Sequence, residues 1–348
     1  MTTQNTDRAL SPAQIALARS RTYTLLSQLT AEGITQETWP MVQQLDYFTD
    51  ALANVEFDLD SVAATHQDIF GFSITPYQSV FLDTTSMLGG DETNRLLESY
   101  RLAGVPSVAA LVESPSFAAI LDTPDHIATE LALLAFLCGA EADAREDGLG
   151  AVSLRMTNLQ QEFLRTHLLR WLPPLVVAIG QERNPFYTAL SQLLWDFVTD
   201  HVTPVISMTY TASKQLNWQL PTPPNLLEDD KTTLKDIAAF LLRPAYTGIY
   251  LSRSQLRRLA RQHRLPHGFG EREVLLTNML KSAVQYDIFA TFVQALMAEI
   301  DHYQRQYKYL CEEQDEAIAF IIQPWQTRTD EANEFLRKVE TMASELAE

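Results

Sequence analysis

The sequence predicts an all-α protein with one large domain or two. Apolar residues recur at spacings of three and four along most of the 348 residues, as they do on the buried face of a helix. The alternation of apolar and polar residues that marks half-buried strands is nearly absent. A hydrophobic content of 46% supports a sizeable core in a chain of this length.

The first helix is marked by its cap. Residues 11–14, SPAQ, have the spacing of a capping box with proline in the first turn, and apolar residues recur from Ile15 to Leu29. Further helices are expected at 36–53, 59–69, 92–103, 124–145, 151–170 and 185–201. Phe163, His167 and Trp171 lie on one helix face, which we expect to pack against the core.

The stretch 71–90, GFSITPYQSVFLDTTSMLGG, differs from its surroundings. It is rich in glycine, serine, threonine and proline, yet it holds several large apolar residues. We expect an ordered loop rather than a linker. Such a loop either packs over a core or forms the wall of a ligand groove, and both remain open.

The stretch 123–131, TPDHIATEL, starts a strongly apolar helix. Thr123 suits the N-cap, Pro124 the first helical position, and Asp125 the positive end of the helix dipole. His126 and Glu130 are four residues apart and therefore neighbours on the helix surface. One interpretation is a capped helix whose polar residues only satisfy its first turn. The other is that Asp125 and His126 line a binding pocket.

A boundary is expected at 214–231, where prolines precede an acidic cluster. It divides the chain into 1–213, a Pro-rich linker at 214–231, and a helical part at 232–348. Residues 1–220 carry a net charge of −14 and the remainder −4. Helices of the last part are expected at 230–242, 252–264, 271–284, 286–310 and 313–346, with Ser252 and Gln255 spaced as a capping box.

Charge and composition limit the partners. A net charge of −18 argues against nucleic acid and anionic membranes and favours neutral or basic partners. The N-terminal residues lack a basic region followed by an apolar one, and no run of about 18 apolar residues occurs. The two cysteines cannot form a disulfide framework. We expect a cytoplasmic protein without a membrane-spanning segment.

Catalytic and cofactor motifs are missing from the sequence. It has no GxGxxG, P-loop, HExxH, CxxC or GxSxG pattern. His263 and His267 are four apart, but Pro266 and Gly268 interrupt a shared helix face and nearby arginines would repel a cation. The sequence therefore predicts no enzyme, no metal site and no bound cofactor.

Six arginines occur between Arg243 and Arg264 with no acidic residue among them. Four of them follow at intervals of four, four and three, along one side of the expected helix: Arg253, Arg257, Arg261 and Arg264. Such a row suits a phosphate or a pterin diphosphate. A solvated face, paired with acids of the first part and holding the two halves together, is the other interpretation.

An ordered set of motifs resembles the TorD-like family of redox-enzyme maturation chaperones, which includes the DmsD and NarJ types. The motifs are Tyr77-Gln78-Ser79-Val80-Phe81-Leu82 after Phe70-Gly71, YRLAGV at 100–105, Pro124-Asp125-His126 with Glu130-Leu131, the 163–173 stretch FLRTHLLRWLP, and Phe186-Tyr187. The resemblance covers about residues 10–202. From about Val205 on, the chain departs from the family, whose typical members end near there.

The resemblance implies a TorD-like helical bundle, followed here by an additional C-terminal helical region of unknown role. It also implies a non-enzymatic chaperone for the catalytic subunit of a molybdenum or tungsten oxidoreductase. The chaperone would bind the twin-arginine signal peptide, or another segment, and assist cofactor insertion and assembly before export. Candidate peptide-binding residues are Tyr77, Ser79, Phe81, Pro124, Asp125, His126 and Glu130.

In that interpretation Asp125 presents an outward carboxylate to peptide arginines, and His126 bonds the peptide backbone. Tyr77 and Phe81 bury the apolar part, with Trp171 as a further candidate. Two alternatives stay open. One is a cofactor- or nucleotide-carrying protein that uses the Arg243–Arg264 segment, and the other is a structural adaptor subunit of an oxidoreductase complex. A homodimer also stays open.

Overall fold

The computed structural model describes residues 10–53, 57–86, 88–105, 111, 123–212, 218–229, 231–266, 270–312 and 316–347. Each regular element in these ranges is a helix, which confirms the all-α prediction. No helix among the described residues is long and apolar enough to cross a membrane. The chain forms two compact units, each described here by itself. Unit 1 comprises residues 1–33 and 94–168, and unit 2 comprises 34–93 and 169–348.

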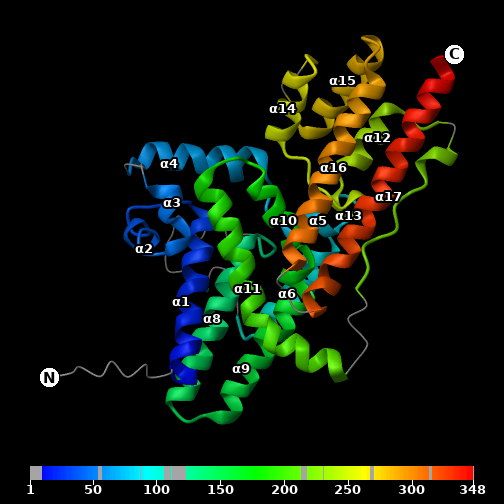
Figure 1. Cartoon of the computed structure of the whole chain (residues 1–348). Coiled ribbons are helices and arrows are strands. Elements are labelled where there is room, and N and C mark those ends of the chain that lie inside the picture. The colour runs from blue at the N-terminus through cyan, green and yellow to red at the C-terminus, as the bar shows by residue number, and fades with distance from the viewer. Residues whose placement is uncertain are drawn as a thin grey trace. The chain divides into compact units, whose positions relative to one another are not determined.

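Unit 1 is built on two long helices that run side by side, α1 (Pro12–Ala31) and α8 (Ile127–Glu146) (Figure 1). Two serines of α1 donate hydrogen bonds to carbonyls of α8, Ser27 to Ala128 O at 2.6 Å and Ser20 to Ala135 O at 2.8 Å. Gly139 lets the helices approach, since a Cβ there would lie 3.2 Å from Ser20 Oγ. The expected capping box at Ser11 is confirmed.

The remaining helices of unit 1 are most of α6 (Asp91–Leu102), then α9 (Gly150–Phe163), which continues into a π-helical turn at Leu164–Leu168. Phe163 and His167 are buried, and so is Trp171 in unit 2, which confirms their expected packing in a core. His167 Nε2 lies 2.8 Å from Ser99 Oγ, so the buried ring has a hydrogen-bond partner.

The start of α8 differs from its prediction. The helix begins at Ile127 rather than at 124, and its N-cap is His126, whose backbone is extended (φ −75°, ψ 140°). His126 Nδ1 accepts a hydrogen bond from Ala128 N at 3.1 Å. Thr123, the expected N-cap, instead offers its carbonyl to Thr129 Oγ1 at 3.1 Å. A turn therefore places Pro124 and Asp125 before the helix.

Unit 2 begins with short elements. They are α2 (Trp39–Val42), a 3₁₀ turn at Asp46–Phe48, α3 (Thr49–Leu52), α4 (Leu59–His66), a π-helical segment at Gln67–Ser73, and α5 (Gln78–Leu82). The helix expected at 36–53 is thus broken into pieces. The loop expected at 71–90 is ordered where the structure describes it, but it contains the end of the π-helical segment and all of α5.

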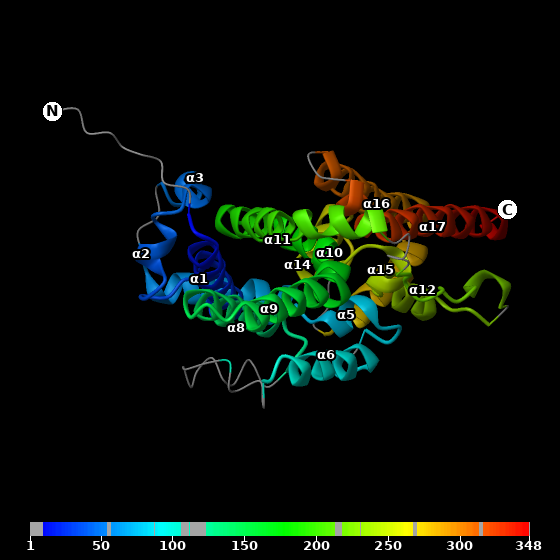
Figure 2. The same cartoon turned by 90° about the horizontal axis from the view of Figure 1, so that it is seen from below.

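Longer helices form the rest of unit 2. They are α10 (Leu169–Gly180), α11 (Pro185–Ala212), α12 (Leu234–Leu241), α13 (Pro244–Thr247), α14 (Arg253–Gln262), α15 (Arg272–Gln285), α16 (Phe289–Glu312) and α17 (Glu316–Ala347). Helices α16 and α17 lie side by side (Figure 2). The boundaries of α12, α14, α15, α16 and α17 lie within four residues of those predicted. The predicted capping box at Ser252 is also present.

The core of unit 2 is rich in buried aromatic residues that also make polar contacts. Tyr303 donates to Tyr250 O at 2.8 Å, and Tyr307 donates to Gly248 O at 2.6 Å. Gly248 has a φ of +73°, and a Cβ there would lie 2.6 Å from the carbonyl oxygen of Trp325. Glycine is therefore required where α13 meets α17.

Unit 2 combines segments from both sides of the expected linker. Described linker residues are packed, since Leu220 is buried and the carbonyls of Leu220 and Pro221 accept hydrogen bonds from Arg328. Residues 213–217 and 230 of that region lie outside the described residues. The division into 1–213, 214–231 and 232–348 stays a prediction.

Candidate functional site

The polar residues at the start of α8 form a buried cluster in unit 1. Asp125 and Glu130 are fully buried and His126 is 5% exposed. Tyr100 joins them, because its hydroxyl donates to Pro124 O at 3.0 Å. Burial raises the pKa of Tyr100 well above its ordinary value, and the nearby carboxylates of Glu130 and Asp125 raise it further.

This cluster corrects one expectation. The Asp125 carboxylate does not point outward from the helix start but lies inside unit 1. Burying a carboxylate costs free energy unless close polar partners offset it, so buried acidic residues in proteins are usually hydrogen-bonded or paired. The structure thus brings the Pro124-Asp125-His126 turn and Glu130 into contact with Tyr100 of the 100–105 segment. The sequence motifs showed only the order of these segments along the chain.

The other group of candidate residues lies in unit 2, on and before α5. Tyr77 is half-buried and is the N-cap of α5, while Ser79 and Phe81 are fully buried. The Phe81 ring contacts two other aromatic rings, with its centroid 5.4 Å from that of Trp171 and 5.1 Å from that of Tyr250. The burial of Ser79 and Phe81 agrees with the interpretation that this loop packs over a core.

Tyr250 fixes this arrangement with its hydroxyl group. Thr75 N donates to Tyr250 Oη at 2.9 Å, and Tyr250 Oη lies 3.4 Å from the carbonyl oxygen of Ser73, to which it donates. Arg272 stacks on the Tyr250 ring with its guanidinium carbon 4.3 Å from the centroid. A residue of the C-terminal region therefore packs directly on the loop. The candidate residues Tyr77, Ser79 and Phe81 belong to unit 2 and the other four to unit 1, so a groove that joins them stays a prediction.

The arginine row lies mainly on α14. Arg257 and Arg261 are exposed, and neither makes an ion pair with a described residue. Arg253 donates to Gly270 O at 2.7 Å. The row is shorter than predicted, because α14 ends at Gln262 and Arg264 follows it with a φ of +54°. Arg264 therefore does not continue the helix face.

Arg258, on the same helix, takes part in a polar network around Glu182. It donates to Ser254 Oγ at 3.1 Å and to Gln181 O at 3.2 Å. Ser254 and Ser73 in turn donate to the Glu182 carboxylate, at 2.6 Å and 3.0 Å. Burial lowers the pKa of Arg258, and the carboxylates of Glu182 and Glu299 oppose that shift.

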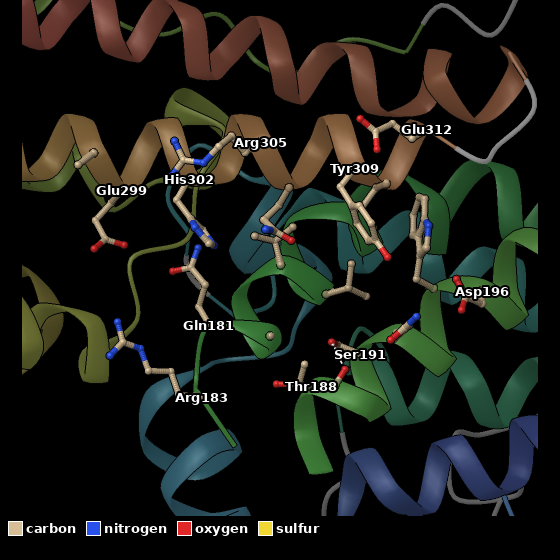
Figure 3. A pocket seen from close by; sticks show the side chains of 18 of the residues that line it. Gln181, Arg183, Thr188, Ser191, Asp196, Glu299, His302, Arg305, Tyr309 and Glu312 are labelled. Atoms are coloured by element: carbon tan, nitrogen blue, oxygen red, sulfur yellow. Dashed lines mark hydrogen bonds between the residues drawn. The ribbon is translucent and has the colours of Figure 1, made fainter. Parts of the chain in front are cut away.

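A cavity of about 810 Å³ lies beside this network, within unit 2 (Figure 3). Its walls come from α10, the α10–α11 turn, α11, α14 and α16. The charged side chains that line it are Arg183, Arg258, Arg305, His302, Glu299, Asp196 and Glu312. Of these residues, only Arg258 belongs to the arginine-rich segment from Arg243 to Arg264. The signal for the α16 side was the recurrence of polar residues every three or four positions from Glu299 to Glu312.

Two of these side chains titrate abnormally because of burial. Burial lowers the pKa of His302, and the cations of Arg305 and Arg183 lower it further. Burial raises the pKa of Glu299, while Arg258 and Arg183 oppose that shift.

No cluster of metal-ligating side chains occurs among the described residues. His263 is the C-cap of α14, and its ring lies 5.9 Å from that of Phe292. His267 lies outside the described residues.

Part of the chain matches a known protein family. Residues 34–177 match the family described as nitrate reductase delta subunit. A comparison with curated proteins finds no match. The matched span includes the 77–82 loop, the buried cluster at the start of α8 and the stretch from Phe163 to Trp171. Residues 34–177 therefore belong to this family, the NarJ/TorD type of redox-enzyme maturation chaperone.

Proposed function

We propose that this protein is a cytoplasmic chaperone for the catalytic subunit of a molybdenum or tungsten oxidoreductase. It binds the twin-arginine signal peptide, or another segment, and assists cofactor insertion and assembly before export. The observation that carries the proposal is the family match over residues 34–177, which spans both groups of candidate peptide-binding residues. The family acts with molybdoenzyme catalytic subunits and is not catalytic.

Charge supports the proposed partner. The chain carries a net charge of −18, so a peptide with two arginines is attracted over a distance of several ångströms. Asp125 and Glu130 offer carboxylates, and hydrogen bonds between a guanidinium and a carboxylate are stronger than those between neutral groups. Because both are buried, a peptide arginine reaches them only when the turn at 123–126 moves. Binding is therefore expected to couple to a local opening of that turn.

A synthetic twin-arginine leader peptide tests this proposal. Fluorescence anisotropy of the labelled peptide should show binding that Asp125→Asn weakens about tenfold to a hundredfold, since a hydrogen bond to a charged group contributes about 1.5–3 kcal/mol. Asp143→Asn is the matched control, because Asp143 is an exposed acid of α8, the helix that follows Asp125, and the substitution makes the same change of charge. A twin-lysine peptide should bind more weakly, as lysine cannot make the bidentate contact.

Equal affinity of Asp125→Asn and the parent protein would remove Asp125 from the site. Absence of any binding to the leader peptide by the full chain would contradict the signal-peptide part of the proposal. Circular dichroism of each variant shows whether it is still folded.

The exposed arginines of α14 support a second candidate, a cofactor- or nucleotide-carrying protein. Arg257 and Arg261 are free of ion pairs among the described residues and lie four apart on one face. Binding of inorganic pyrophosphate that falls steeply with salt and with Arg257→Ala would support it. An adaptor subunit, the third candidate, would instead purify with a stoichiometric partner.

A further inference from the structure

The cavity in unit 2 is elongated along α16. Its lining residues on that helix follow at three- and four-residue steps, from Glu299 through His302, Arg305 and Tyr309 to Glu312, and so lie on one face. Thirteen residue steps of helix correspond to about 20 Å. Thr188, Ser191 and Trp195 of α11 line the opposite side at the same spacing.

The two ends of the cavity carry opposite charge. Figure 3 shows Arg183, His302 and Arg305 toward one end, with Glu299 beside them, and Asp196 and Glu312 at the other end. Arg258 belongs to the first end, because it interacts electrostatically with both Glu299 and Arg183. The lining of that end holds three arginines and Glu299, and Glu182 of the adjacent network adds a second carboxylate near Arg258, so three cations face two carboxylates and the end stays basic. Asp196, which accepts a hydrogen bond from Tyr47 at 3.0 Å, and Glu312 make the other end acidic.

The backbone at Arg183 shows that this side chain is held at a cost. Arg183 has a φ of +59°, which lies in the left-handed region that disfavours a residue with a Cβ. It is exposed and makes no ion pair with a described residue. Glycine would take this turn without strain. The residue with the strained backbone is therefore also the one that places a cation at the mouth of the cavity.

Groups between the charged ends suit a polypeptide backbone. Val176, Val177 and Trp195 supply apolar surface, and the hydroxyl groups of Thr188 and Ser191 lie beside them. Gln181 Nε2 is buried and donates to no group of the described residues. An unused buried donor is costly, and a carbonyl oxygen of a bound ligand would satisfy it.

We propose that this cavity binds an extended peptide segment of about six residues, with an acidic side chain at the Arg183–Arg305 end, apolar side chains between, and a basic side chain at the Asp196–Glu312 end. The length follows from a rise of about 3.3 Å per extended residue over about 20 Å. A single small anion would use the basic end and leave the rest of the cavity unfilled. This proposal goes beyond the chaperone function proposed above and does not depend on it.

Labelled hexapeptides with blocked termini test the proposal by fluorescence anisotropy on the full chain. Two peptides carry Asp and Lys at opposite ends of four apolar residues, in the two possible orders, and a third carries Asn and Gln instead. One charged order should bind the protein at least tenfold more tightly than the neutral peptide. High salt should weaken that binding, because charge pairs at the rim of a cavity are screened.

Arg183→Gly is the decisive variant, because it removes the cation and relieves the backbone strain together. It should bind the charged peptide about tenfold more weakly while its melting temperature is unchanged or raised. Asp287→Gly is the matched control, since Asp287 has a φ of +57° and does not line the cavity. Glu312→Gln should weaken the same peptide from the other end.

Three results would overturn the proposal. One is equal affinity of Arg183→Gly and the parent protein for the charged peptide. Another is equal binding of the charged and neutral peptides, or binding of none of them at 1 mM. The third is displacement of the charged peptide by inorganic phosphate at equimolar concentration, which would assign the basic end to a small anion. Binding of the twin-arginine leader is measured separately, with Asp125→Asn, so failure of one proposal leaves the other intact.

Discussion

Replacing Tyr250 should destabilise the whole of unit 2, because its ring and its hydroxyl group join the C-terminal region to the loop at 73–82. Tyr250→Ala removes a fully buried ring that stacks on Phe81 and that also makes a cation–π contact with Arg272. Truncation of a buried aromatic residue to alanine costs about 3–5 kcal/mol. Tyr250→Phe keeps the ring but leaves Thr75 N without its acceptor, which costs about 1–3 kcal/mol.

Urea unfolding followed by tryptophan fluorescence measures both variants. The five tryptophans lie at 39, 171, 195, 218 and 325, so all of them report on unit 2. We expect one fluorescence transition whose midpoint falls in the order parent, Tyr250→Phe, Tyr250→Ala. Phe335→Leu, which removes the ring that contacts Phe240, serves as a comparison for loss of an aromatic contact without loss of a hydroxyl group. A loss below 1 kcal/mol for Tyr250→Ala would refute this reasoning, and so would two separate transitions of which only one shifts.

Two further predictions concern packing and pH. Gly248→Ala should lower the free energy of unfolding by about 3 kcal/mol, because the added Cβ would lie 2.6 Å from Trp325 O in a left-handed backbone; a loss below 1 kcal/mol in urea unfolding would contradict this. His302 has a lowered pKa, so the unfolded chain binds its proton more readily, and stability should fall as the pH drops below about 6.5. His302→Gln should lose less stability than the parent between pH 7 and pH 5, and an equal loss would show that this ring does not contribute.

Local features of the fold were predictable from the sequence. The capping boxes at Ser11 and Ser252 lie where they were expected, because a cap depends on residues three positions apart. The burial of Phe163, His167 and Trp171 followed from helical periodicity. The order of the motifs along the chain likewise pointed to the family that matches residues 34–177.

The start of α8 and the content of the 71–90 stretch were not predictable in the same way. Thr123 is a good N-cap by composition, yet His126 takes that role, with Thr123 bonded to Thr129 and Pro124 bonded to Tyr100. The choice between two adequate caps depends on a contact with a residue more than twenty positions away. Tertiary packing, not local preference, sets the helix boundary here.

The sequence by itself determined the helical class, most helix boundaries, the acidic character and the motif order of this protein. The tertiary structure decided which of the marked residues are accessible. It buries Asp125 inside unit 1, places Phe81 under Tyr250, and lines one cavity with Arg183, Asp196 and His302 from separate helices and turns. The physical reason is range: caps and periodicity depend on neighbours along the chain, whereas burial and the meeting of charges depend on segments up to 181 residues apart.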